Sequence, residues 1–361
     1  MRHKKKLIIL FLLVLALACL QLMLPLNAYT VELYDQYVFR PYQTVRNIIF
    51  GYIPISIGDI LYLLAGLGIL ITIGRWIYYV AKFRSHRQIL WASFLHALIG
   101  IATIYILFFI GWGGNYYKPS LTTYWDLDKR KSNEDSAIIG FDRFLVGKIN
   151  EYAVHYEGLP FRVTDKRARQ YYKDYTDRRT RLLGVNTKPS IFGYLMQHLG
   201  IQGYYNPFTG EAQVNRFLPS FMLPYVVCHE MAHQAGIAAE DDANLLAYVL
   251  STRVDDTAFR YSAYFNLWLY TNSRLRMQDS TMANMFKQQL NPLSQRHLDT
   301  LRDIRRRYSS ELSEYSGQLY DGYLKLHHQK DGIRSYNRVS ASAWAWEQLR
   351  DSVKEPAIII P

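Results

Sequence analysis

Three long apolar runs within the first 115 residues constrain the fold more than any other feature of this sequence. They extend roughly from Leu7 to Leu26, from Ile57 to Val80 and from Ile89 to Trp112. Each is close to the length of about 20 residues at which a helix spans the hydrocarbon core of a bilayer. Buried helices of a globular domain rarely reach this length three times in so short a stretch. We therefore predict a membrane domain over residues 1–114, with transmembrane helices at 7–26, 57–80 and 89–112.

Basic residues flank these runs in a pattern that predicts their orientation. Arg2 to Lys6 precede the first run, and Lys82 to Arg87 separate the second from the third. Because basic segments next to membrane spans tend to stay in the cytoplasm, both are predicted to be cytoplasmic. Everything after Gly114 is then extracytoplasmic. The predicted location is a bacterial inner (cytoplasmic) membrane, with a multi-pass topology and a periplasmic C-terminal domain.

Charge and cysteine content narrow the class of protein further. The formal net charge is +12, and part of it comes from the basic segments that flank the apolar runs. The sequence contains no zinc-finger, RNP or P-loop pattern, so no nucleic-acid partner is expected. Cys19 and Cys228 are poorly placed for a disulfide framework. The partner that these features indicate is the lipid bilayer, and the oligomeric state stays open.

The remainder of the chain reads as one folded domain. Residues 115–137 are polar and aromatic and predict a linker, and residues 138–361 predict an extracytoplasmic domain. Helical patterns cover 138–156, 170–183 and 189–199, two extended runs around Pro207 and Gly210 indicate a hairpin at 203–215, and the sequence is helical beyond 243. The predicted fold class is mainly α: three transmembrane helices, then an α+β domain with a small β-hairpin or sheet and a helical C-terminal half.

The chemistry is concentrated in His-Glu-x-x-His at residues 229–233. Because His229 and His233 are four residues apart, they share one face of a helix and can bind a single metal ion. Imidazole ligands suit Zn²⁺. In such sites the carboxylate of Glu230 takes a proton from the water at the metal and later passes one to the leaving amine. The motif therefore predicts two zinc ligands and a general base.

A third ligand is expected just beyond the motif. Gly236 follows His233 by three residues, where a helix can end in the left-handed conformation and reverse the chain. Three acids come next, and a catalytic zinc usually takes three protein ligands. We favour Glu240, because it lies four residues before Asn244, which could orient a ligand histidine. Asp242 and Asp241 stay open as alternatives, and all three acids could instead stabilise a helix N-terminus.

Two further features carry weaker hypotheses. Tyr261 follows the motif and is our candidate for donating a hydrogen bond to the oxyanion of a tetrahedral intermediate, although most of the 30 tyrosines must be structural. The run Glu211 to Asn215 could form an exposed strand edge that binds an extended substrate. A plain hairpin packed on helices explains that run equally well.

These residues resemble a known superfamily. His229-Glu-x-x-His233 with a downstream Glu resembles the zincins and their Glu-ligand branch, the gluzincins. Glu240-Asp-Asp-Ala-Asn244 is similar to the Glu-x-x-x-Asp element of that branch. Two departures stand out: Asn244 replaces the usual Asp, and the gap between His233 and Glu240 is much shorter than in thermolysin-like enzymes. The resemblance implies a zincin-like fold and peptidase activity.

A second resemblance covers nearly the whole chain. It is carried by Trp112-Gly-Gly-Asn-Tyr-Tyr, Pro207-Phe-Thr-Gly-Glu-Ala-Gln-Val-Asn215, His229-Glu-Met-Ala-His-Gln, Tyr261-Ser and Tyr323-Leu-Lys. These segments resemble an uncharacterised bacterial membrane family, domain of unknown function 3810. The resemblance implies the same layout of three spans followed by a zincin-like domain, and it implies no substrate.

Two functional hypotheses follow. The first is a membrane-anchored zinc metallopeptidase that hydrolyses peptide bonds in cell-envelope peptides or proteins, with His229, His233 and Glu240 as ligands of Zn²⁺. The second is a non-catalytic zinc-binding membrane sensor or scaffold. A fourth protein ligand from Asp241 or Asp242 would close the coordination sphere and favour the second hypothesis.

Overall fold

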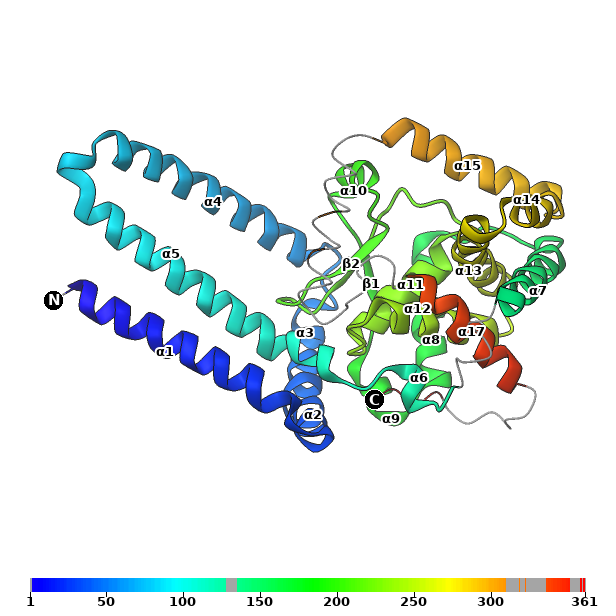
Figure 1. Cartoon of the computed structure of the whole chain (residues 1–361), viewed down its shortest axis with the longest axis horizontal. Coiled ribbons are helices and arrows are strands. Elements are labelled where there is room, and N and C mark those ends of the chain that lie inside the picture. Colours follow the sequence, from blue (N-terminus) through cyan, green and yellow to red (C-terminus); the bar gives the residue numbers. More distant parts are fainter. Residues whose placement is uncertain are drawn as a thin grey trace. The chain divides into compact units, whose positions relative to one another are not determined.

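The computed structural model describes residues 2–127, 135–309 and 336–350, together with Gln318, Gly322, Ile358 and Ile360. It is mainly helical, with a small mixed sheet of three strands (Figure 1). The chain divides into two compact units. The first comprises Met1–Lys118 and Asn206–Gly210, and the second comprises Pro119–Tyr205 and Glu211–Pro361.

The first unit contains three helices that are long and apolar enough to cross a membrane, as the apolar runs predict. Helix α1 covers Arg2–Met23, α4 covers Ile57–Ala81 and α5 covers Phe83–Gly111. The third helix begins six residues earlier than predicted, because Lys82 alone separates α4 from α5. Arg84 and Arg87, which belong to the basic segment between the second and third apolar runs, therefore lie in the first turns of α5. A hydrogen bond of 2.9 Å from Trp76 Nε1 to Ser93 Oγ joins α4 to α5.

Short helices complete the first unit. They are the 3₁₀ helix η1 (Leu24–Leu26), α2 (Ala28–Tyr34), the π-helix η2 (Asp35–Phe39), α3 (Arg40–Phe50) and the 3₁₀ helix η3 (Gly113–Tyr117). Helix α3 has an inverted amphipathic pattern. Its buried face carries the polar side chains of Gln43, Arg46 and Asn47, whereas Ile48 and Ile49 are exposed. An apolar face turned outward is typical of a helix that contacts lipid.

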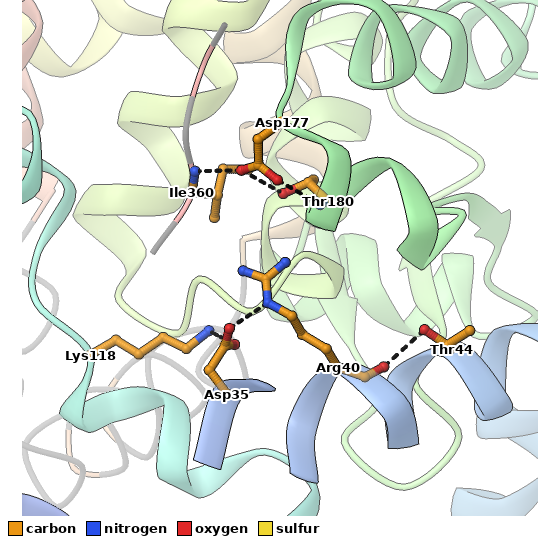
Figure 2. Close-up of polar contacts among 7 residues, drawn as sticks. All are labelled: Asp35, Arg40, Thr44, Lys118, Asp177, Thr180 and Ile360. Carbon is orange, nitrogen blue, oxygen red and sulfur yellow. Dashed lines mark hydrogen bonds and ion pairs between the residues drawn. The ribbon is translucent and has the colours of Figure 1, made fainter. Parts of the chain in front are cut away.

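A buried ionic cluster links the short helices of this unit. The wide turn of η2 brings Arg40 next to Asp35, and Lys118 approaches the same carboxylate from the residues after η3 (Figure 2). Burial lowers the pKa of Lys118 to about 8, although Asp35 opposes this effect. Removing one partner of such a buried cluster leaves an uncompensated charge. Asp35 therefore holds two segments that are 83 residues apart in the chain.

Helices α11 (Leu223–Gln234), α12 (Glu240–Arg253) and α13 (Thr257–Gln278) form the centre of the second unit (Figure 1). Almost every residue of α12 is buried, so this helix is surrounded by protein. The other described helices of the unit are α6 (Leu121–Tyr124), α7 (Asp135–Ala153), α8 (Phe161–Tyr175), α9 (Arg178–Leu183), α10 (Gly193–Leu199), α14 (Ser280–Gln288), α15 (Pro292–Tyr308) and α17 (Tyr336–Arg350).

The predicted helices of the second unit differ from the observed ones in several places. The helix expected from Gln170 begins at Phe161. The helix expected over 170–183 is interrupted at Thr176 and Asp177, where the carboxylate of Asp177 caps α9. Asp177 Oδ2 also accepts a hydrogen bond of 3.1 Å from the backbone of Ile360 (Figure 2). The helix expected over 189–199 begins only at Gly193, because Pro189 ends a strand and residues 190–192 form a turn. Residues 128–134 of the expected linker and the resemblance segment beginning at Tyr323 lie outside the described residues.

The sheet has the strand order β1-β3-β2. Strand β1 (Thr187–Pro189) pairs in parallel with β3 (Ala212–Val214), and β2 (Gly203–Tyr205) pairs with β3 in antiparallel fashion. The predicted hairpin is therefore present. Its second strand lies in the middle of the sheet, so the expectation that Glu211 to Asn215 forms an exposed edge is wrong. The edge next to the hairpin turn is β2.

Asp142 makes the stability of the second unit dependent on pH. Its buried carboxylate accepts hydrogen bonds from Trp268 Nε1 at 2.8 Å and Asn272 Nδ2 at 3.2 Å. Burial raises its pKa from 3.8 to about 7, although these two hydrogen bonds oppose the shift. Because the folded state holds this proton more tightly than the unfolded state, stability falls as the pH rises from about 4 to about 7.

We expect Asp142→Asn to remove this loss of stability. Relative to wild type, the variant should gain on the order of 2–4 kcal/mol in unfolding free energy between pH 4 and pH 8. Unfolding midpoints of the detergent-solubilised chain across this range test the prediction. Asp303→Asn, at an exposed position, is the matched control. Identical pH profiles for wild type and Asp142→Asn would contradict the assignment.

Candidate metal centre

Helix α11 places the two histidines of the motif one turn apart. Their Nε2 atoms are 3.2 Å from each other, and the two rings meet edge to face with centroids 4.7 Å apart. The helix is buried over nearly its whole length, so the pair lies within the protein rather than on its surface. Two imidazole nitrogens therefore point at one small region, as the i, i+4 spacing predicts.

The chain reverses direction immediately after α11. Gly236 has a φ of +96°, a backbone conformation that favours glycine, and Ile237 N donates to Ala232 O at 3.1 Å. The predicted left-handed turn is therefore present. It also brings Ile237 O to 2.7 Å from His233 Nδ1. Since a carbonyl oxygen can only accept, Nδ1 of His233 carries a proton. When the ring is neutral, its Nε2 atom can therefore offer its lone pair to a metal.

The first residue of α12 completes the cluster. Glu240 Oε2 lies 3.3 Å from His229 Nε2, and Glu240 Oε1 lies 3.5 Å from His233 Nε2. Ligands held about 2.0–2.2 Å from a tetrahedral zinc ion are separated from one another by roughly 3.3–3.5 Å. The Nε2–Nε2 spacing of 3.2 Å and the two Nε2–O spacings are close to this range, with each histidine facing a different oxygen of Glu240. Among the described residues, His229, His233 and Glu240 form the group that can share one metal ion.

The other two acids have different surroundings. Asp241 Oδ2 faces Arg338 Nε of α17 at 3.2 Å. Asp242 is buried and is not a member of the metal-compatible group among the described residues. Of the three candidate acids, Glu240 is the one that the structure brings to the histidines.

Asn244 lies one turn after Glu240 and faces His229. Tyr225 donates a hydrogen bond of 2.9 Å to Asn244 Oδ1. Within the described part of the chain, Asn244 Nδ2 and His229 Nδ1 are buried without a hydrogen-bond partner. Exchanging the amide O and N of Asn244 would give His229 Nδ1 an acceptor and leave an N–H next to Tyr225. This arrangement suits the orienting role predicted for Asn244.

Glu230 lies between the histidines in sequence but faces the sheet. A Cβ atom at Gly203 would lie 2.7 Å from Glu230 Cγ, so strand β2 passes directly over this side chain. Burial raises the pKa of Glu230 to about 8. Its Oε2 atom is buried and has no hydrogen-bond partner among the described residues. A carboxylate oxygen is therefore available to a small polar molecule beside the cluster.

Two tyrosines of α13, Tyr261 and Tyr270, have different surroundings. The hydroxyl of Tyr261 is bonded to His297 Nδ1 at 2.8 Å and to Ser294 Oγ at 3.1 Å, which places it in a cluster with α15. Tyr270, nine residues further along α13, is partly buried, and burial together with the charge of Glu240 raises its pKa. The negative charge of Glu240 thus acts electrostatically on Tyr270. Nothing in its local sequence indicates this, since 30 residues separate it from Glu240.

The electrostatics of the cluster favour an ionised carboxylate. Burial alone would raise the pKa of Glu240, but His233 and His229 outweigh it and hold the pKa well below the usual range. Burial lowers the pKa of His229. The carboxylate of Glu240 and the neutral imidazole of His229 can therefore act as ligands. A cation between the three side chains would replace the second proton of His233, the one on Nε2.

A comparison with protein families identifies the chain. A family model described as "Protein of unknown function (DUF3810)" matches residues 34–341. The chain belongs to the DUF3810 family. No curated protein and no solved structure matches the chain significantly. In this DUF3810 member the matched region includes two of the three candidate spans, the sheet and the whole His229–His233–Glu240 cluster.

We expect Glu240→Ala to weaken Zn²⁺ binding by at least about a hundredfold, since it removes one of three ligands. Asp241→Ala removes a carboxylate from the adjacent position and should leave the affinity nearly unchanged. Competition with a chromophoric chelator, using the detergent-solubilised full chain, measures both. Equal losses in the two variants would show that the acids act only through their general negative charge.

Proposed function

We propose that this protein is a membrane-anchored zinc metallopeptidase. His229, His233 and Glu240 would hold the zinc ion, and Glu230 would be the general base. The observation that supports this most strongly is the close approach of the three side chains. The two Nε2 atoms are 3.2 Å apart, and they lie 3.3 and 3.5 Å from Oε2 and Oε1 of Glu240, respectively. Two nitrogens and one carboxylate oxygen match the ligands of catalytic zinc in peptidases of the zincin type.

The alternative of a closed, structural zinc site requires a fourth ligand. Structural sites are almost always four-coordinate with protein ligands, whereas catalytic sites keep one position for water. Asp241, the nearest further acid in sequence, is paired with Arg338. The three-membered group among the described residues therefore favours a catalytic site over a sensor or scaffold.

Zinc, when bound, polarises a carbonyl group and lowers the pKa of a water molecule. The protein supplies the proton transfers. Glu230 Oε2 can accept a proton from the attacking water, and the raised pKa of the buried carboxyl group suits it to hold that proton. The same group can then donate it to the departing amine nitrogen. The Tyr261 hydroxyl is bonded to His297 and Ser294. Tyr270, whose pKa Glu240 helps to raise, is therefore a second candidate for stabilising negative charge on the carbonyl oxygen.

Strand β2 suits the binding of an extended peptide. It lies at an edge of the sheet, and Gly203 brings its backbone against Glu230. An added strand at such an edge forms main-chain hydrogen bonds whatever its side chains. The substrate class that fits is therefore an unfolded segment of a peptide or protein. If the basic segments before α1 and between α4 and α5 are cytoplasmic, the substrate is in the bacterial cell envelope.

We expect Glu230→Gln to abolish most hydrolysis without loss of zinc. The amide is nearly isosteric with the carboxylate but cannot accept the proton, which should lower kcat by roughly 10²–10⁴-fold. The measurement combines zinc content with the cleavage of quenched-fluorescent casein by the full chain. Wild-type rates in the zinc-loaded Glu230→Gln variant would exclude this mechanism.

We expect Gly203→Ala to impair catalysis through a steric clash. The new methyl group would meet the carboxyl group of Glu230 and displace either that side chain or strand β2. Zinc should still bind, while kcat/KM for casein falls by at least about tenfold. Gly147→Ala, at an exposed helical position with open space around it, is the matched control and should retain full activity. Unchanged hydrolysis in Gly203→Ala would place the substrate elsewhere.

A further inference from the structure

The second unit contains a cavity of about 620 Å³ that the candidate metal centre does not use. Its lining comes from α7, α13 and α17, which pack together within this unit (Figure 1). Volumes of roughly 300–1,000 Å³ are typical of sites for small molecules. Each helix contributes side chains three or four residues apart, and therefore from one face. They are Phe144, Lys148 and Tyr152 of α7, Arg260 and Tyr264 of α13, and Trp344, Glu347 and Gln348 of α17.

Four aromatic rings form a continuous series along this cavity. Tyr152 and Tyr264 are stacked, with centroids 5.7 Å apart and an interplanar angle of 12°. Phe144 meets Tyr264 edge to face at 6.1 Å and lies 5.8 Å from Trp344. Tyr264 is buried, whereas the other three are only partly buried against the core. A further ring can extend this series, because aromatic pairs are favourable at centroid distances of about 4.5–7 Å.

Two cations lie beside the Tyr152 ring. Lys148 Nζ is 5.9 Å from the ring centroid, and Arg260 Cζ is 5.5 Å from it. Their acidic partners are exposed: Lys148 pairs with Glu151 at 2.8 Å, and Arg260 pairs with Asp255 at 3.3 Å. Ion pairs with exposed partners are weak, because water screens them. Both cations can therefore still attract an anion that enters the cavity.

The guanidinium group of Arg260 is oriented by the protein itself. Its Nε atom donates a hydrogen bond of 2.7 Å to Val254 O, and Nη1 donates one of 3.3 Å to the hydroxyl of Tyr152. Among the described residues, no hydrogen bond uses Nη2. A guanidinium group held in this way suits a carboxylate, because little conformational freedom is lost when the new hydrogen bond forms.

Glu347 also lines the cavity, and its charge is opposite to that of the two cations. Its Oε1 atom accepts a hydrogen bond of 2.9 Å from Tyr248, a fully buried residue of α12. The lining thus carries two positive charges and one negative charge. A cationic ligand would also approach the Tyr152 ring, beside which Lys148 and Arg260 already lie. The charge of the lining therefore favours an anion.

We propose that this cavity binds a small carboxylic acid that carries an aromatic ring. Arg260 and Lys148 bind the carboxylate, and the ring packs against the aromatic series that ends at Trp344. Two sources supply this chemistry: a free aryl carboxylic acid, or the C-terminus of a peptide whose last residue is aromatic. The inference does not depend on the proposed peptidase function, since the cavity shares no residue with the metal-compatible group.

The test titrates the detergent-solubilised full chain with 3-phenylpropionate and measures Kd by ligand-observed NMR, with detergent micelles alone as the blank. Two probes of similar size separate the charge from the ring. In 3-phenylpropylamine an ammonium group replaces the carboxylate, and in 3-cyclohexylpropionate a saturated ring replaces the aromatic one. N-acetyl-alanylphenylalanine, with a free or an amidated C-terminus, distinguishes the two sources.

The variants change one lining charge at a time. Lys148→Met and Arg260→Gln should each weaken the binding of 3-phenylpropionate at least about tenfold, because each removes a hydrogen bond to a charged group. Glu347→Gln keeps an acceptor for Tyr248 and removes a like charge, so binding should tighten about threefold. Arg143→Met, at an exposed position of α7 outside the lining, is the matched control and should equal wild type.

The inference holds if 3-phenylpropionate binds at least about threefold more tightly than both matched probes and both cation variants lose affinity. A peptide with a free C-terminus that binds as tightly supports the peptide source, and a weaker one supports the free acid. No binding of 3-phenylpropionate to folded wild type would overturn the inference. Tighter binding of the amine, lost in Glu347→Gln, would overturn it as well. If one cation variant does not fold, the probe series and the other variant decide. Zinc binding and casein cleavage are unaffected by these results, so the proposed function is tested separately.

Discussion

The left-handed turn at Gly236 is the constraint on which the candidate metal centre depends. Three residues after His233, a φ of +96° reverses the chain and starts α12 at Glu240, so that the carboxylate returns to the histidines of α11. A side chain with a Cβ atom at this position would cost roughly 1–2 kcal/mol and would favour continuation of the helix. Ala232 and Ala235, both fully buried, let the two helices approach closely. A short connection thus brings the acid at the start of α12 back to the histidines of α11.

The charge balance of this region explains why a divalent ion suits it. Glu230 and Glu240 are both buried, and together they would carry two negative charges if ionised. Burying each charge costs several kcal/mol unless an opposite charge or hydrogen bonds compensate it. Without a metal, compensation comes from protons, which explains why the pKa of Glu230 is raised while that of His233 reaches about 9. A doubly charged cation would balance both carboxylates and leave both imidazoles neutral, so metal binding would also stabilise the fold.

The features predicted from sequence are those that local spacing encodes. Three apolar runs predict three apolar helices, and the i, i+4 histidines followed by a glycine and acids predict the partners that meet. The errors concern long-range pairing. Strand β3 lies in the middle of the sheet because β1 joins it in parallel from 25 residues away, and three-residue runs do not specify such order. Tyr270 and Gly203 reach the site through tertiary packing alone. The interrupted helix at Asp177 reflects a cap and a contact with Ile360, far away in sequence.

Helix α3 buries its polar face and exposes its apolar face, the reverse of the usual amphipathic pattern. In water, its apolar face would be buried and its polar face exposed; here Val45, Ile48 and Ile49 are exposed while Gln43 and Arg46 are buried. Because its apolar side chains face outward, the hydrophobic effect contributes little to the packing of its polar face. Directional hydrogen bonds then decide the pairing. The carbonyl oxygens of Pro207 and Gly210 accept directional hydrogen bonds from the guanidinium of Arg46 and the amide of Gln43, respectively. The polar face of α3 therefore holds the loop Asn206–Gly210 of the same unit through hydrogen bonds rather than through apolar packing.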